Sequence, residues 1–84
     1  MAYTRADLHA ADLQIMQAQR NIVRQSALVG RLEDERHSAT TARALLVTFD
    51  ETLVTLQRHR DNIAAALDRL QGEDEAGPKG NRRD

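Results

Sequence analysis

Apolar residues recur every seven positions along most of this chain, in two runs separated by a single break in register. A seven-residue apolar repeat lines up side chains along one face of an α-helix, so each run predicts one long helix. The runs are separated by thirteen residues instead of fourteen, and His37 and Ser38 lie in that interval. The break therefore predicts a turn between two helices. The first run is Leu8, Ile15, Ile22 and Val29, and the second is Ala42, Phe49, Leu56, Ile63 and Leu70.

Residues at the ends of the two runs predict where each helix begins and ends. Thr4, followed three residues later by Asp7, matches the pattern of a capping box at the start of the first helix. Ser38 is a suitable N-cap for the second helix, and Gly72 suits a left-handed C-cap at its end. Two helices of similar length joined by a very short turn are antiparallel. We therefore expect an all-α fold, a helical hairpin with helices over about residues 5–36 and 39–71.

The composition limits what such a hairpin can do. A chain of 84 residues buries only a thin core, and without cysteine it has neither a disulfide nor a thiolate zinc site to stabilise it. Its 12 Lys and Arg against 13 Asp and Glu give a net charge of -1, which argues against electrostatic binding of nucleic acid. No stretch is long and apolar enough for a membrane span, and the charged N-terminal residues lack the apolar core of a signal peptide. We expect a cytoplasmic protein.

Residues 72–84 differ in composition from the rest of the chain. They contain three of the four glycines of the chain, its single proline and no large apolar residue. Without apolar side chains to bury, nothing offsets the entropy lost on ordering such a segment. We therefore expect two segments, a helical hairpin over residues 1–71 and a disordered C-terminal tail over residues 72–84.

Each predicted helix carries one main apolar stripe, and the stripe of the second helix has the larger side chains. We expect the two stripes to face each other and to form the core of the hairpin and of any dimer. The candidate core or dimer residues are Ile15, Ile22, Val29, Leu46, Phe49, Leu53, Leu56, Ile63 and Leu67.

A second, weaker apolar line runs beside each stripe, again with a spacing of seven. It consists of Met16 and Val23 in the first helix and Val47 and Val54 in the second. Two helices cannot cover this line as well as the main stripes. Burial of apolar area stabilises a fold by about 25 cal/mol per Å², and the loss of conformational entropy costs about 1.5 kcal/mol per ordered residue. For a lone two-helix hairpin the two terms nearly cancel, so its net stability is close to zero. We therefore expect a homodimer that forms a four-helix bundle or coiled coil, with a monomer as the alternative.

One charged residue interrupts the stronger stripe. Arg60 lies at its centre, between Leu56 and Ile63, and the register of the hairpin brings Asp12 within reach. Asp12 and Arg60 are therefore a candidate register pair. Two interpretations remain open: a buried ion pair or anion site, or an Arg that pairs simply or extends its head group to solvent.

No pattern in the chain predicts catalysis, a metal or a cofactor. The three histidines, His9, His37 and His59, do not show the i, i+4 spacing of a helical metal pair, and no glycine-rich phosphate loop is present. Only two residues are aromatic and no basic stripe exists, so nucleic-acid binding is not expected. We expect a non-enzymatic interaction or structural module whose partner is a second copy or another protein. The alternative is a small nucleic-acid-associated regulator.

Two segments, Ile22–Gln25 and Ser38–Leu53, resemble a widespread group of short bacterial proteins of unknown function, and the resemblance covers roughly residues 8–70. It implies a bacterial helical hairpin and no particular activity. That group often has Gly at the position of Arg36 and Asp at the position of Ser38. The departure at both positions predicts a tighter or more strained turn in this chain.

Overall fold

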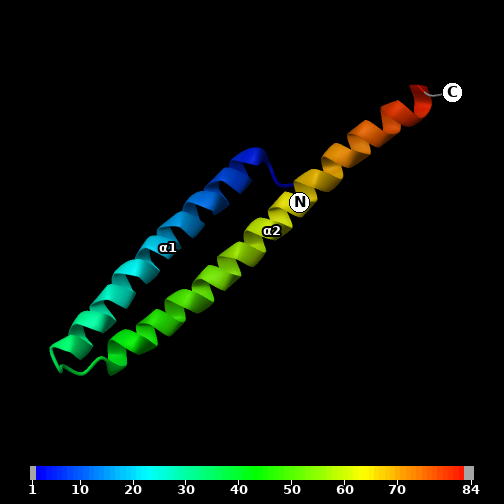
Figure 1. Ribbon diagram of the computed structural model, residues 1–84. Coiled ribbons are helices and arrows are strands. Elements are labelled where there is room, and N and C mark those ends of the chain that lie inside the picture. The colour runs from blue at the N-terminus through cyan, green and yellow to red at the C-terminus, as the bar shows by residue number, and fades with distance from the viewer. Residues whose placement is uncertain (1, 83–84) are drawn as a thin grey trace.

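The computed structural model describes the backbone of residues 2–82 and the side chains of residues 2–71. Its helices are α1 (Arg5–Asp34) and α2 (Thr40–Arg82), and the described residues contain no strand. The two helices lie side by side and antiparallel, joined by a short turn (Figure 1). The predicted all-α helical hairpin is therefore confirmed. The molecule measures 74 × 19 × 14 Å, so it is a single layer of helices.

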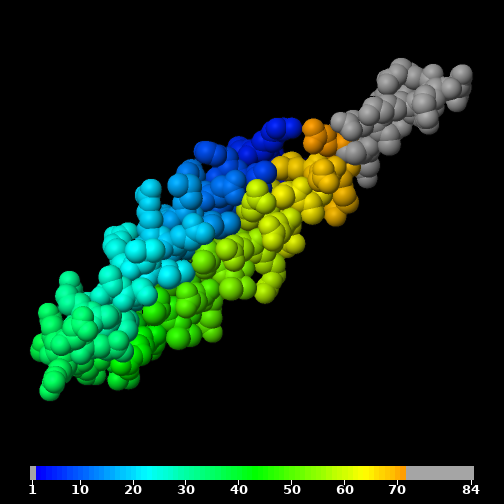
Figure 2. All heavy atoms as spheres, in the orientation of Figure 1, coloured from blue at the N-terminus to red at the C-terminus, as the bar shows by residue number. Residues whose placement is uncertain are grey.

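Side chains of α1 and α2 pack along one seam over the length of α1 (Figure 2). Of the nine candidate core residues, only Ile63 is buried, with 1% of its surface exposed, and the other eight are half-buried. The remaining buried apolar residues are Ala11, Ala39 and Ala42. A helix in a single layer is covered by one neighbour only, so large side chains at the seam keep part of their surface in water.

The start of α1 is fixed by the predicted capping box, which the structure confirms. The Oγ1 atom of Thr4 accepts a hydrogen bond from the backbone N–H of Asp7 at 3.2 Å, and Oδ2 of Asp7 accepts one from the N–H of Thr4 at 2.9 Å. Two N–H groups that the helix itself leaves without acceptors are thereby satisfied.

The end of α1 is a Schellman motif that contains an arginine. After the C-cap residue Glu35, Arg36 has a φ of 61°, in the left-handed region. The N–H of Arg36 donates to the carbonyl of Glu33 at 3.1 Å, and the N–H of His37 donates to that of Leu32 at 2.8 Å. A left-handed conformation costs a residue with a Cβ about 1–2 kcal/mol. The turn thus stores strain at Arg36, where glycine would have none.

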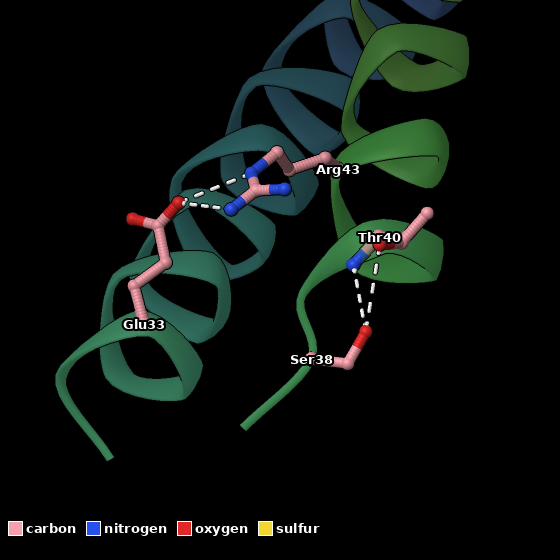
Figure 3. Close-up of polar contacts among 4 residues, drawn as sticks. All are labelled: Glu33, Ser38, Thr40 and Arg43. Carbon is pink, nitrogen blue, oxygen red and sulfur yellow. Dashed lines mark hydrogen bonds and ion pairs between the residues drawn. The ribbon is translucent and has the colours of Figure 1, made fainter. Parts of the chain in front are cut away.

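The start of α2 differs by one residue from the prediction. The carbonyl of Ala39 accepts the first helical bond, from the N–H of Arg43 at 2.8 Å, so Ala39 and not Ser38 holds the N-cap position. Ser38 lies just before it, and its Oγ accepts a bond of 3.5 Å from the N–H of Thr40 (Figure 3). Ala39 is 3% exposed. Its small side chain fits the interior of the turn, while the polar Ser38 stays exposed and still satisfies one helical N–H.

The end of α2 also differs from the prediction, because the helix continues to Arg82 instead of ending at Gln71. The helix runs through Gly72, so Gly72 does not form the predicted C-cap. A glycine inside a helix costs only about 1 kcal/mol relative to alanine, so Gly72 by itself does not end the helix. The structure does not describe the side chains of residues 72–84, so the expected disorder of this segment stays a prediction. Within the described residues, neither helix is long and apolar enough to cross a membrane.

Candidate interaction surface

The structure brings the candidate register pair together at the edge of the seam. Nε of Arg60 donates a hydrogen bond to Oδ1 of Asp12 at 2.9 Å, and Oδ1 of Asp61 lies 3.7 Å from Nη1 of Arg60. The side chain of Arg60 is 38% exposed and that of Asp12 46%. In the single hairpin this pair is partly exposed, which favours an arginine that pairs simply over a buried ion pair. The single neighbouring helix leaves the guanidinium in contact with solvent.

The same contacts raise the pKa of Arg60 above its ordinary value. The hydrogen bond that Arg60 donates to Asp12 is the largest cause, followed by the negative charge of Asp12, and Asp61 adds a smaller effect. Partial desolvation acts in the opposite direction and is outweighed. The guanidinium therefore keeps its charge throughout the range in which the protein can be studied, and the pair is not a pH switch on the arginine side.

A second polar link crosses the seam at Gln25, a residue that sequence reasoning did not single out. Its Nε2 donates to the backbone carbonyl of Ala42 at 3.0 Å, in a part-buried position. The signal was present in the sequence, because Ala11, Ala18, Gln25 and Leu32 are spaced by seven. A polar residue in a heptad line of a helical seam favours one register over its neighbours.

A third link joins the helices next to the turn. Nε and Nη2 of Arg43 both approach the same oxygen, Oε2 of Glu33, at 3.0 and 2.6 Å (Figure 3). Both side chains are about half exposed, so the pair adds little to stability. The links at Asp12, Gln25 and Glu33 nonetheless agree on one register along the whole hairpin.

The four residues of the second apolar line are exposed in the hairpin. Met16 and Val23 are 48% and 68% exposed, and Val47 and Val54 are 56% and 52% exposed. Met16 and Val23 line a shallow hollow on the surface of α1 alone, and the other residues of this hollow are Gln19, Arg20 and Arg24. We call the four residues the outer line. They lie on the outward sides of the two helices and do not form a groove between them.

A groove does run between α1 and α2. Two adjoining hollows share Gln14 and continue each other along one side of the seam. We call this feature the polar groove. One hollow is lined by Ala2, Tyr3, Asp7, Ala10, Ala11, Gln14, His59 and Ile63, and the other by Gln14, Gln17, Ala18, Asn21, Thr52 and Leu56.

The polar groove contains few ionisable side chains. Among its lining residues the only Asp, Glu, Lys or Arg is Asp7, which the capping box already engages. Tyr3 packs edge-on against His59, with ring centroids 6.1 Å apart and an interplanar angle of 80°. Sequence reasoning missed this surface because it followed apolar residues. The available signal was a pair of uncharged heptad lines, one formed by Gln14, Asn21 and Leu28 and the other by Leu45, Thr52, His59 and Ala66.

Within the described residues, no group of three or more His, Asp or Glu side chains is placed to hold a metal ion. Comparison of the chain with known proteins gave no matching family model, no similar curated protein and no similar solved structure. The resemblance to short bacterial hairpin proteins therefore stays a prediction. What the geometry offers is an interaction surface, formed by an incompletely covered seam, the polar groove and the outer line.

Proposed function

We propose that this chain is a non-enzymatic interaction or structural module of the cytoplasm, and that two hairpins associate into a homodimeric four-helix bundle. The observation that supports this proposal is the incomplete seam, in which eight of the nine candidate core residues are only half-buried. Stable domains pack at least two layers of secondary structure around a shared core. A second hairpin laid on the first would supply the missing layer.

The energies involved make such an association feasible. Moving a half-buried aliphatic side chain to full burial recovers roughly half of its transfer free energy, about 1 kcal/mol. Two hairpins contribute eight such residues each, so complete coverage would supply up to about 16 kcal/mol, against an association cost of about 4–15 kcal/mol. The balance favours dimerisation when most of these residues are covered. The outer line is then free to contact another protein.

Sedimentation equilibrium and thermal unfolding test this proposal. Across the micromolar range, we expect a molar mass of twice 9.4 kDa and a thermal midpoint that rises with protein concentration. A single 9.4 kDa species at every concentration, with a constant midpoint, would contradict the proposal. Titration with duplex DNA and RNA at low salt, where electrostatic binding is strongest, tests the alternative of a nucleic-acid-associated regulator.

A further inference from the structure

We infer that the polar groove is the face on which the second copy of this chain docks, so that the two grooves meet across a two-fold axis. This inference rests on the proposed self-association and specifies which side of the hairpin is used. It excludes the outer line as the centre of the dimer interface.

The two sides of the hairpin differ in charge. Residues two apart on an α-helix point about 160° apart, so Asp12 lies on the opposite side of α1 from Gln14. For the same reason, Asp50 lies on the opposite side of α2 from Thr52. The side away from the groove carries Asp50 and the Asp12–Arg60 pair. The middle part of the groove carries uncharged side chains only, and Asp7, engaged in the capping box, lies at its end near the start of α1.

Two-fold symmetry favours an uncharged face. In a two-fold interface the same patch contributes from both subunits, and a residue near the axis meets its own copy. A charged residue there would face a like charge, but an amide or a hydroxyl both donates and accepts hydrogen bonds and therefore complements itself. Charged residues are also depleted at the centres of protein interfaces. Gln14, Gln17, Asn21 and Thr52 fit these requirements.

The groove also gives access to some of the apolar residues that need cover. Leu56 and Ala18 line it and are half-buried. Leu28 and Leu45, which belong to the two uncharged heptad lines, continue this side toward the turn, and Leu45 is 43% exposed. Alanine at positions 10 and 18 lets another helix approach closely. By contrast, Met16 and Val23 form a hollow on one helix that is bordered by two arginines.

Charged variants of the groove provide the test. Gln17 and Thr52 are exposed in the hairpin, so the acidic double variant Gln17→Glu/Thr52→Glu and the basic double variant Gln17→Lys/Thr52→Lys should both fold, which circular dichroism verifies. In a dimer of either variant, like charges meet across the interface. We expect the dissociation constant from sedimentation equilibrium to rise at least tenfold at low salt. Mixing the acidic and basic variants should restore a dimer, whatever the detailed register of the interface.

The matched control is Gln19→Glu/Gln57→Glu, which adds the same charges on the other side of the hairpin at two exposed positions. We expect it to dimerise like the unmodified chain. Equal weakening of the control and the acidic variant, or a groove variant that dimerises normally, would overturn the inference while leaving self-association intact. An unmodified chain that is monomeric would refute the proposed function and the docking face together.

Discussion

The two ends of the hairpin are packed differently from its middle. Among the described side chains of residues 2–71, every buried one lies toward an end: Ala11 and Ile63 near the start of α1, and Ala39 and Ala42 beside the turn. Between them, over residues 15–29 of α1 and 46–56 of α2, the structure shows half-buried and exposed side chains only. The outer line and the Gln17–Thr52 part of the polar groove fall within this middle section.

The difference shows what two helices can and cannot do alone. At the ends, additional chain contributes cover: the N-terminal segment brings Tyr3 against His59, and the turn encloses Ala39. In the middle each helix has one neighbour, and large residues such as Phe49 and Leu53 keep part of their surface in water. The ends therefore stabilise the hairpin itself, and the middle is the section that the proposed dimer would cover.

The largest expected effect contrasts an end residue with a middle residue. Ile63→Ala removes a buried side chain and should cost about 2–4 kcal/mol of unfolding free energy in any state of assembly. Leu56→Ala should cost about half as much in a lone hairpin, because Leu56 is half-buried there, and nearly the full amount in the dimer, because Leu56 lines the polar groove. Urea unfolding of each variant measures both costs.

The comparison between the end residue and the middle residue is made in two backgrounds, one dimeric and one dissociated. Each substitution is made in the unmodified chain and in the Gln17→Glu/Thr52→Glu variant, in which we expect the dimer to dissociate. A cost of Leu56→Ala that is the same in both backgrounds would break the distinction between the ends and the middle. The cost of Ile63→Ala serves as the internal reference because Ile63 is covered within the hairpin.

A smaller effect is expected at the turn. Arg36→Gly relieves the strain of a left-handed arginine, about 1–2 kcal/mol, but also increases the entropy of the unfolded chain by about 0.4–1 kcal/mol. The net expectation is a gain of about 0.5–1 kcal/mol, visible as a higher thermal midpoint. Arg36→Ala is the control, because it removes the side chain while keeping the strain. If Arg36→Ala stabilises the hairpin as much as Arg36→Gly does, strain is not the cause.

The features that the sequence predicts correctly depend on local spacing or on the register of the hairpin. The capping box of Thr4 and Asp7 is local, and the turn follows from one break in a heptad repeat. Once the turn is placed, antiparallel packing brings Arg60 opposite Asp12 without further information. For each of these features the chain has few alternative arrangements, so the spacing of residues along the sequence is enough to predict it.

The features that the sequence does not predict depend on the surroundings of a residue in the folded chain. The apolar stripes indicate which residues face the seam, but the extent of their burial is set by the single layer of helices. Gln25 was missed because attention to apolar positions passes over a polar residue in a heptad line. The end predicted at Gly72 was wrong because a glycine can either cap a helix or continue it, and its neighbours decide.

The last effect, similar in size to the one at the turn, separates the two sides of the hairpin next to its middle section. Gly30 lies two residues after Leu28, which ends an uncharged heptad line, so its Cα faces about 160° away from the polar groove. A Cβ at Gly30 would have no atom within 4 Å in the hairpin, so Gly30→Ala should add up to about 1 kcal/mol through helix propensity. If the dimer forms through the groove, the same gain appears in the dimer and in the dissociated Gln17→Glu/Thr52→Glu variant. A gain that disappears only in the dimer would place a close helix contact at Gly30, and hence the interface on the opposite side.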